Sequence, residues 1–531
     1  MTIRPREGVM GSLPDSFLRG AVLLSAAGLL SRVLGLYRLA LPALMGATGV
    51  GLYHMAYPVY AVALTLSTGG IPVAISKLVA ERAAEGRHHE ARRVFTLSFL
   101  GLAPLGAMLA LLLYLSAPAF ALDLARDPRA VLSIQAISPA VFLVAVMSAY
   151  RGYFQGYQNM APTALSQLVE QAGRVLAILA LVVFLAPLGV DHQAAGATFG
   201  AVAGAAIGLA FLVVTHARWR PPPDQTLGGP RESAGAILGS LAALALPVAA
   251  AGLAVPLMQL GDLVIVPTRL MAEGIKTMVR TSLYGQLAGY AMPVANLPAI
   301  VTVALGVAVV PAIAEARARG DEATLRRLME AALRVAGMVA MPAGLGLWVL
   351  GPSITALLFG SPAAGLPLRM LGPSVFFLGI LQASAGGLQG TGRAVSALVN
   401  VFMGVILKLV LTWFFVIPLG VSGAALATSL GYGFAALLNV ISLKRLELLP
   451  SFVSTFLRPA AGLPILYVAS RLALVLLPPG GVAAVGAVIA GGAGYMTGLI
   501  LLGGLTDEDL RLIPSGAIVR RFLVRIGLWR R

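Results

Sequence analysis

Two arginines lie inside the first long apolar run of the chain. Arg32 and Arg38 fall within the stretch SAAGLLSRVLGLYRLALPALMG, whose other residues are almost all apolar or small. A cation near the centre of a bilayer costs about 2.5–3.5 kcal/mol, so two of them in one membrane helix indicate an aqueous cavity beside that helix. Six residues turn a helix through about 600°, which places the side chains roughly 120° apart and about 9 Å apart along the axis. Both can border one wide cavity, where we expect an anionic substrate to bind.

A second pair of cations lies at matching places in the two halves of the chain. Arg174 follows Glu170 by four residues, and a Glu–Arg pair at this spacing can neutralise itself on one helix face. Arg174 is therefore either a cavity cation or half of a structural pair. Lys408 has no such partner in its own span, so we expect Lys408 to be the freer cation.

Asp262 is a carboxylate inside an apolar span, and Arg269 follows it two turns later. An isolated carboxylate in a membrane is by default a site for a coupling ion or a proton. The alternative is a structural ion pair with Arg269 or with another cavity arginine. The sequence leaves both alternatives open.

The composition excludes a soluble globular protein. Of 531 residues, 58% are hydrophobic and only 11% are charged, too few to cover a globule of this size. The chain has no cysteine, which excludes disulfides and thiolate chemistry, and its five histidines show no metal-ligand spacing. We expect no metal and no cofactor other than a Na⁺ or H⁺ coupling ion. The net charge of +17 lies mostly in short loops, where topology and anionic lipid explain it better than nucleic acid.

Fourteen membrane spans are predicted from apolar runs that reach the roughly 20 residues needed to cross a bilayer. They lie near 17–43, 50–78, 94–116, 131–155, 162–187, 195–216, 236–267, 284–314, 335–358, 370–390, 396–418, 421–442, 456–478 and 482–504. We predict the following organisation: an N-terminal lobe (1–216), a proline-rich linker (217–233), a C-terminal lobe (234–442), two more helices (443–504) and a basic tail (505–531). Most of the 38 basic residues lie in one of the two alternating sets of loops, which places both termini in the cytoplasm.

The two lobes repeat each other. Phe154-Gln155-Gly156 recurs as Leu388-Gln389-Gly390 at a spacing of 234, and Arg174 recurs as Lys408 at the same spacing. Six spans per copy give both copies one orientation, so we expect an axis along the membrane normal with the substrate site between the copies. Breaks at Gly69–Pro72 and at Pro293–Pro298 interrupt corresponding spans, either as bending points for transport or as packing kinks.

Several stretches resemble a known transporter family. The run Ser31-Arg32-Val33-Leu34-Gly35, with Arg38 three residues later, resembles the first helix of the lipid II flippases, MurJ. Residues 51–81, 151–171 and 296–316 are similar to the branch of stage V sporulation protein B and YtgP. These proteins form part of the MOP superfamily, together with MATE transporters and polysaccharide exporters.

The resemblance implies a two-lobed exporter in the bacterial inner membrane that flips an undecaprenyl-diphosphate-linked precursor outward by alternating access. Arg32 and Arg38 match two arginines that the lipid II flippases require. A third required arginine, in the second helix, has no counterpart, because Leu66-Ser67-Thr68 stands in its place. A sodium site of some relatives uses acidic and asparagine side chains, to which Asp262 and Asn400 would correspond.

We therefore predict an all-α polytopic membrane protein that acts as a monomeric lipid II exporter and not as an enzyme. The substrate-binding candidates are Arg32, Arg38, Arg174, Arg269 and Lys408. The ion-coupling candidates are Glu170, Asp262 and Asn400. One alternative is export of another lipid-linked oligosaccharide. A MATE-type drug exporter would favour acidic residues, and a membrane glycosyltransferase would need an extramembrane loop with catalytic carboxylates or histidines.

Overall fold

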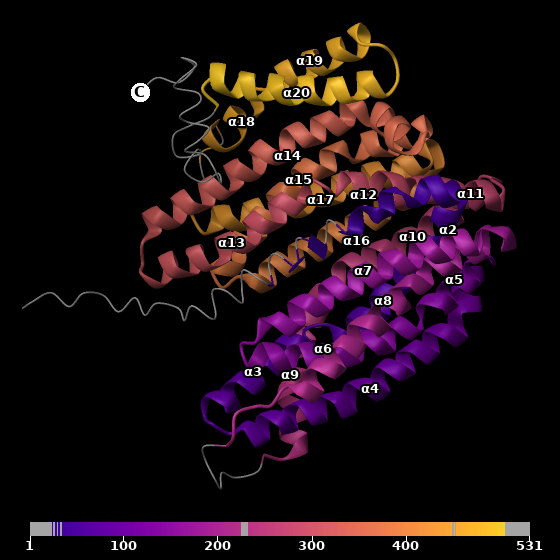
Figure 1. The fold of residues 1–531 in the computed structure, drawn as a ribbon. Helices are drawn as coiled ribbons and strands as arrows, with labels where there is room; N and C mark the ends of the chain where they lie inside the picture. Colours follow the sequence, from indigo (N-terminus) through magenta and orange to yellow (C-terminus); the bar gives the residue numbers. More distant parts are fainter. Residues whose placement is uncertain are drawn as a thin grey trace, which may run out of the picture. The chain divides into compact units, whose positions relative to one another are not determined.

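The computed structural model of the chain is helical (Figure 1). It describes residues 34–224, 232–448 and 453–504, together with 24, 27, 28, 30, 31 and 451. Within these residues there is no strand, and fourteen helices are long and apolar enough to cross a membrane. The predicted all-α membrane class is confirmed.

The chain divides into two compact units. Unit 1 takes the described parts of Met1–Tyr37, Met55–Leu122 and Pro128–Pro256, and unit 2 takes Arg38–His54, Asp123–Asp127 and the described parts of Leu257–Arg531. Four segments contribute to both units: η1 (Gly35–Leu39), α2 (Leu41–Thr68), η2 (Phe120–Leu124) and α10 (Ala254–Ala272). Unit 1 further holds α3 (Ile71–Ala84), α4 (His88–Ala119), α5 (Ala130–Ile137), α6 (Pro139–Gly156), α7 (Met160–Phe184), η3 (Ala186–Leu188), α8 (Val190–Arg218) and α9 (Ala234–Gly252).

The longest part of unit 2 begins at Leu257, within α10 (Ala254–Ala272). It continues with α11 (Thr277–Gly285), η4 (Gln286–Ala291), α12 (Met292–Ala295), α13 (Ala299–Ala318), α14 (Glu322–Phe359), η5 (Pro362–Ala364) and α15 (Gly365–Gly390). Its last elements are α16 (Ala394–Leu419), α17 (Val421–Arg445), η6 (Val453–Leu457), α18 (Arg458–Ala460), α19 (Leu463–Leu476) and α20 (Gly481–Leu501).

The helix pairs that pack together in unit 1 have equivalent pairs in unit 2. In unit 1, α6 packs on α3, α4 and α8, and α7 packs on α8; in unit 2, α15 packs on α13, α14 and α17, and α16 packs on α17. The α19–α20 pair, which lies outside the repeat, packs on α14.

Matching glycines make these contacts possible. A Cβ on Gly156 of α6 would lie 2.5 Å from the Cβ of Val79 in α3, and a Cβ on Gly390 of α15 would lie 2.8 Å from a methyl carbon of Ile313 in α13. Both glycine–partner pairs are related by the spacing of 234 residues, so the sequence repeat corresponds to equivalent helix contacts.

The predicted break at Gly69–Pro72 is present. Helix α2 ends at Thr68, Gly70 adopts a φ of 71°, and α3 begins at Ile71 with a proline in its first turn. Glycine tolerates this left-handed backbone and proline suits a helix start, so the two residue types together separate α2 from α3.

The predicted span 236–267 is not one helix. Helix α9 ends at Gly252 and α10 begins at Ala254, because Pro256 has no N–H to donate to the carbonyl of Gly252 four residues earlier. Helix α9 packs on α3 and α4, so the boundary between the compact units falls at Pro256 rather than at residue 234. Twelve of the 27 residues of the predicted span 17–43, Arg32 among them, and the whole tail 505–531 lie outside the described residues.

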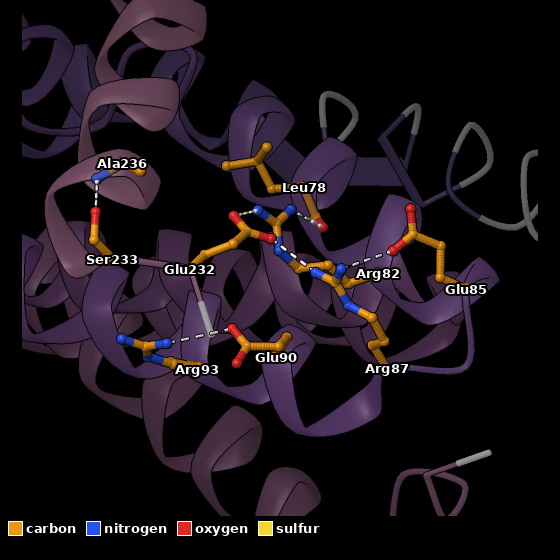
Figure 2. A network of polar contacts seen from close by, with 9 residues as sticks. All are labelled: Leu78, Arg82, Glu85, Arg87, Glu90, Arg93, Glu232, Ser233 and Ala236. Carbon is orange, nitrogen blue, oxygen red and sulfur yellow. Dashed lines mark hydrogen bonds and ion pairs between the residues drawn. The ribbon is translucent and has the colours of Figure 1, made fainter. Parts of the chain in front are cut away.

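Ion pairs hold the start of α9 in unit 1 (Figure 2). The carboxylate of Glu232 accepts hydrogen bonds from Arg82 at the end of α3 and from Arg87, the latter at 2.8 Å. Ser233 caps α9 by accepting a hydrogen bond from the Ala236 backbone N–H at 3.1 Å. Burial raises the pKa of Glu232, but the hydrogen bonds and charges of the two arginines outweigh burial and hold the pKa below its usual value. The end of the linker is thereby tied to the turn between α3 and α4.

Candidate functional site

A cluster of three charged side chains lies inside the helices of unit 1. Glu170 of α7 accepts a hydrogen bond from Arg174, one turn later, at 2.7 Å. The other oxygen of the same carboxylate accepts from Arg151 of α6 at 2.9 Å. Two arginines on one carboxylate give the cluster a net charge of +1. The side chains are 14% (Arg151), 9% (Glu170) and 12% (Arg174) exposed, so each keeps a narrow accessible edge.

The local sequence fixes the arginines of this cluster. Gly204 and Gly208 of α8 allow close approach of α7, since a Cβ on Gly204 would lie 2.8 Å from the Cβ of Arg174. Arg151 also donates from Nε to the hydroxyl of Ser166 at 3.1 Å, which holds its guanidinium in place. The Nε of Arg174 is buried and has no hydrogen-bond partner among the described residues.

Three tyrosines of η1 and α2 interact electrostatically with Arg174. Its guanidinium lies within electrostatic reach of Tyr57 and Tyr60 of α2 and of Tyr37 of η1. Arg32 itself and the side chain of Arg38 lie outside the described residues, and their roles stay predictions.

The matching position in unit 2 is occupied by a closed ion pair. The ammonium group of Lys408 in α16 bonds directly to the carboxylate of Asp262 in α10, and the two side chains are only 1% and 5% exposed. The prediction that Lys408 is a free cation is wrong, because its partner comes from another helix, 146 residues earlier. Asp262 has the structural partner that the sequence left open, but the partner is Lys408 and not Arg269.

Arg269 and Asn400 have other partners. The guanidinium carbon of Arg269 lies 4.4 Å from the centre of the Trp413 ring, a cation–π contact between α10 and α16. The Asn400 amide donates to Asn439 at 2.9 Å and to Ser442 at 3.2 Å, both in α17. Asp262 and Asn400 share no partner among these contacts. Lys408, the partner of Asp262, lies eight residues after Asn400 in α16, about 12 Å along the helix axis.

An apolar groove runs along unit 2. Two adjoining hollows of about 420 and 480 Å³ share Met341 of α14, Phe376 of α15 and Ala460 of α18 as lining residues. The first continues along α17 to Val440 and the second along α14 to Trp348. Their lining is almost wholly apolar, which suits a hydrocarbon chain.

The sequence patterns missed Arg151. Arg151 lies near the end of the predicted span 131–155, where a basic residue is ordinary, and the structure places it within α6, bonded to Glu170. Its pairing joins two helices, and spacing within one helix carries no signal for such a contact. The Glu170–Arg174 pair, by contrast, was visible as an i,i+4 spacing and is confirmed.

The sequence pattern of the polysaccharide biosynthesis protein family matches residues 17–317, more than half of the chain. The chain belongs to this family. Stage V sporulation protein B of Bacillus subtilis (strain 168) is 30% identical over 525 residues, which cover 96% of this chain and 99% of the relative. Lipid II flippase MurJ of the same organism is 29% identical and is matched over 82% of this chain and 83% of its own length.

The fold is that of a solved flippase structure. Lipid II flippase MurJ in its inward closed conformation matches with a TM-score of 0.70 at 15% identity, over 91% of this chain and 98% of that chain. The resemblance inferred from the stretches near Arg32 and in residues 51–81, 151–171 and 296–316 is thereby confirmed.

Proposed function

We propose that this protein flips an undecaprenyl-diphosphate-linked peptidoglycan precursor, lipid II, from the inner to the outer leaflet by alternating access. The observation that carries the proposal is the net positive charge of the Arg151–Glu170–Arg174 cluster inside apolar membrane helices. A diphosphate is a good ligand for such a cluster, since guanidinium forks bind phosphate oxygens in two-point contacts.

The predicted arginines of the first helix extend this site in the proposal. In the lipid II flippases two arginines of the first helix are required, and Arg32 and Arg38 match them. We therefore assign Arg32 and Arg38 to the headgroup together with Arg151 and Arg174. Localisation in the bacterial inner membrane with both termini in the cytoplasm belongs to the same proposal.

The lipid tail is accommodated separately. A polyprenyl chain cannot enter a charged cavity without a large desolvation cost to the polar groups, whereas an apolar groove receives it favourably. The groove along α14, α15, α17 and α18 supplies a lining of this kind within unit 2. We assign the polyprenyl tail of the substrate to this groove.

A second candidate is export of a different lipid-linked oligosaccharide, such as a spore polymer. Two observations favour it. The relative with 30% identity over almost the whole chain is a sporulation protein. The place of the third flippase arginine is taken by Ser67 and Thr68, whose hydroxyls already donate to the carbonyl of Leu64 at 3.0 and 2.7 Å. The headgroup contacts at this end of α2 therefore differ from an arginine fork.

Complementation tests the two candidates against each other. A bacterium depleted of its own lipid II flippases is given this protein, and lipid II exposed on the outer face is scored with membrane levels checked. Restored exposure is the expected result. A well-inserted protein that restores no exposure would contradict lipid II as substrate and favour another lipid-linked glycan.

A further inference from the structure

Glu170 occupies the position that an anionic ligand would take between two arginines. Arg151 and Arg174 come from different helices, and each donates to a different oxygen of the one carboxylate. A phosphate group offers pairs of anionic oxygens to the same donors. The carboxylate and a phosphate group thus compete for one set of hydrogen bonds.

Arg151 and the backbone of Arg174 are held independently of Glu170. Arg151 is anchored through Nε by Ser166, and the backbone carrying Arg174 is packed against Gly204 of α8. Removing the carboxylate leaves these two anchors and gives the two guanidinium groups a net charge of +2. The buried Nε of Arg174 adds a donor that the carboxylate does not use.

We propose that Glu170 is an internal, displaceable counter-anion, and that Arg151 is a substrate-binding residue beside Arg174. The phosphate oxygens of the ligand displace the carboxylate and bind both arginines. Because Glu170 precedes Arg174 by one helical turn, the displaced carboxylate stays within reach and re-forms the pair when the ligand leaves. Competition by Glu170 therefore weakens ligand binding and promotes release. The proposal rests on the proposed function only for the identity of the diphosphate lipid.

The other groups around the site fit this exchange. Tyr37, Tyr57 and Tyr60 lie within electrostatic reach of Arg174, and a tyrosine hydroxyl can hydrogen-bond an anion. The face of α8 packed against Glu170 and Arg174 presents Gly204 and Gly208. Among the side chains shown to interact with the two arginines, Glu170 is the one that carries a negative charge.

Binding of inorganic pyrophosphate to the purified full-length protein tests the proposal by isothermal titration calorimetry. We expect Glu170→Gln to bind pyrophosphate at least tenfold more tightly than the natural protein, and Arg151→Gln and Arg174→Gln to bind at least tenfold more weakly. Glu90→Gln is the matched control, because it makes the same change in the Glu90–Arg93 pair at the start of α4 and should leave the affinity unchanged. A carboxylate with a purely structural role predicts weaker binding in Glu170→Gln.

A second pair of variants keeps the test decisive if Glu170→Gln does not fold. Arg151→Gln alone leaves Arg174 facing its carboxylate, whereas Arg151→Gln with Glu170→Gln restores the natural net charge of +1 without the competitor. The double variant should bind pyrophosphate at least tenfold more tightly than the single variant. Equal or weaker binding would overturn the proposal. The expected pattern together with failed lipid II complementation would retain the counter-anion and reject lipid II as the substrate.

Discussion

Equivalent helices carry different charge states in the two units. Arg174 of α7 and Lys408 of α16 are separated by the repeat spacing, and each packs against a glycine of the next helix, Gly204 or Gly431. In unit 1 the carboxylate is shared with Arg151, which leaves a charge of +1 and side chains 9–14% exposed. In unit 2 one ammonium faces one carboxylate, and both are almost fully buried.

The difference shows how one helix framework can support two tasks. A closed pair such as Lys408–Asp262 gains nothing from a further ligand, because each charge is already neutralised. A cluster with one unmatched positive charge attracts an anion, and its exposed edges leave a route for contact. We infer that unit 1 binds the substrate headgroup and that the pair in unit 2 holds α10 to α16. Substitution of Asp262 and Lys408 also tests the predicted ion-coupling role of Asp262, when transport is measured.

The largest expected effect comes from opening the pair in unit 2. Lys408→Met leaves the buried carboxylate of Asp262 without its partner and should destabilise the protein by about 3–5 kcal/mol. Asp262→Asn combined with Lys408→Met removes both charges and should recover most of this loss. Thermal unfolding of the purified protein in detergent measures both. A double variant as unstable as the single one would contradict a simple structural pair.

A smaller effect tests whether the two units share their packing. A Cβ on Gly204 would lie 2.5 Å from the carbonyl oxygen of Glu170, and one on Gly431 would lie 2.5 Å from the Cβ of Lys408. Gly204→Ala and Gly431→Ala should therefore each destabilise by about 1–3 kcal/mol, as overpacking does. Gly239→Ala in α9 is the control, because its Cβ meets nothing within 4 Å, and it should be neutral or stabilising. If one of these two variants lowered the unfolding temperature and the other raised it, the two units would not share this packing.

The smallest effect concerns an ion pair that unit 1 does not share with unit 2. At the repeat spacing, Arg82 corresponds to Ala316, which carries no charge, and Glu232 lies in the linker outside the repeat. Because the pKa of Glu232 is lowered in the folded protein, its stabilising contribution is present above the ordinary value of 4.5 and is lost as pH falls through the lowered pKa. Glu232→Gln should loosen the start of α9 at neutral pH by roughly 0.5–1 kcal/mol.

A spin label at residue 236 measures this loosening, since the natural chain has no cysteine and Ala236→Cys gives a single label. The label should become more mobile in Glu232→Gln at pH 7, and in the natural chain only below about pH 4.5. Glu85→Gln, in an exposed residue that also pairs with Arg87, should leave the label unchanged. Equal mobility of the label in Glu232→Gln and in the natural chain would show that the ion pairs of Glu232 do not hold the start of α9.

Features encoded within one helix could be predicted from the sequence. Most of the apolar spans, the repeat and the Glu170–Arg174 pair follow from spacing along the chain, and the structure contains them. Features that join distant segments could not. Arg151 meets Glu170 across two helices, and Lys408 meets Asp262 across 146 residues, so no local pattern specified either contact. The predicted freedom of Lys408 failed for this reason, and the split of span 236–267 depended on the effect of one proline, Pro256.

Flipping of lipid II in proteoliposomes tests the division of roles most directly. Three proteins are compared at matched amounts: the natural chain, Arg151→Gln with Arg174→Gln, and Asp262→Asn with Lys408→Met. The natural chain and the unit 2 variant should flip lipid II at similar rates, and the unit 1 variant should lose at least 90% of the activity, a tenfold change worth about 1.4 kcal/mol. An active unit 1 variant beside an inactive unit 2 variant would contradict the assignment of the headgroup to the cluster in unit 1.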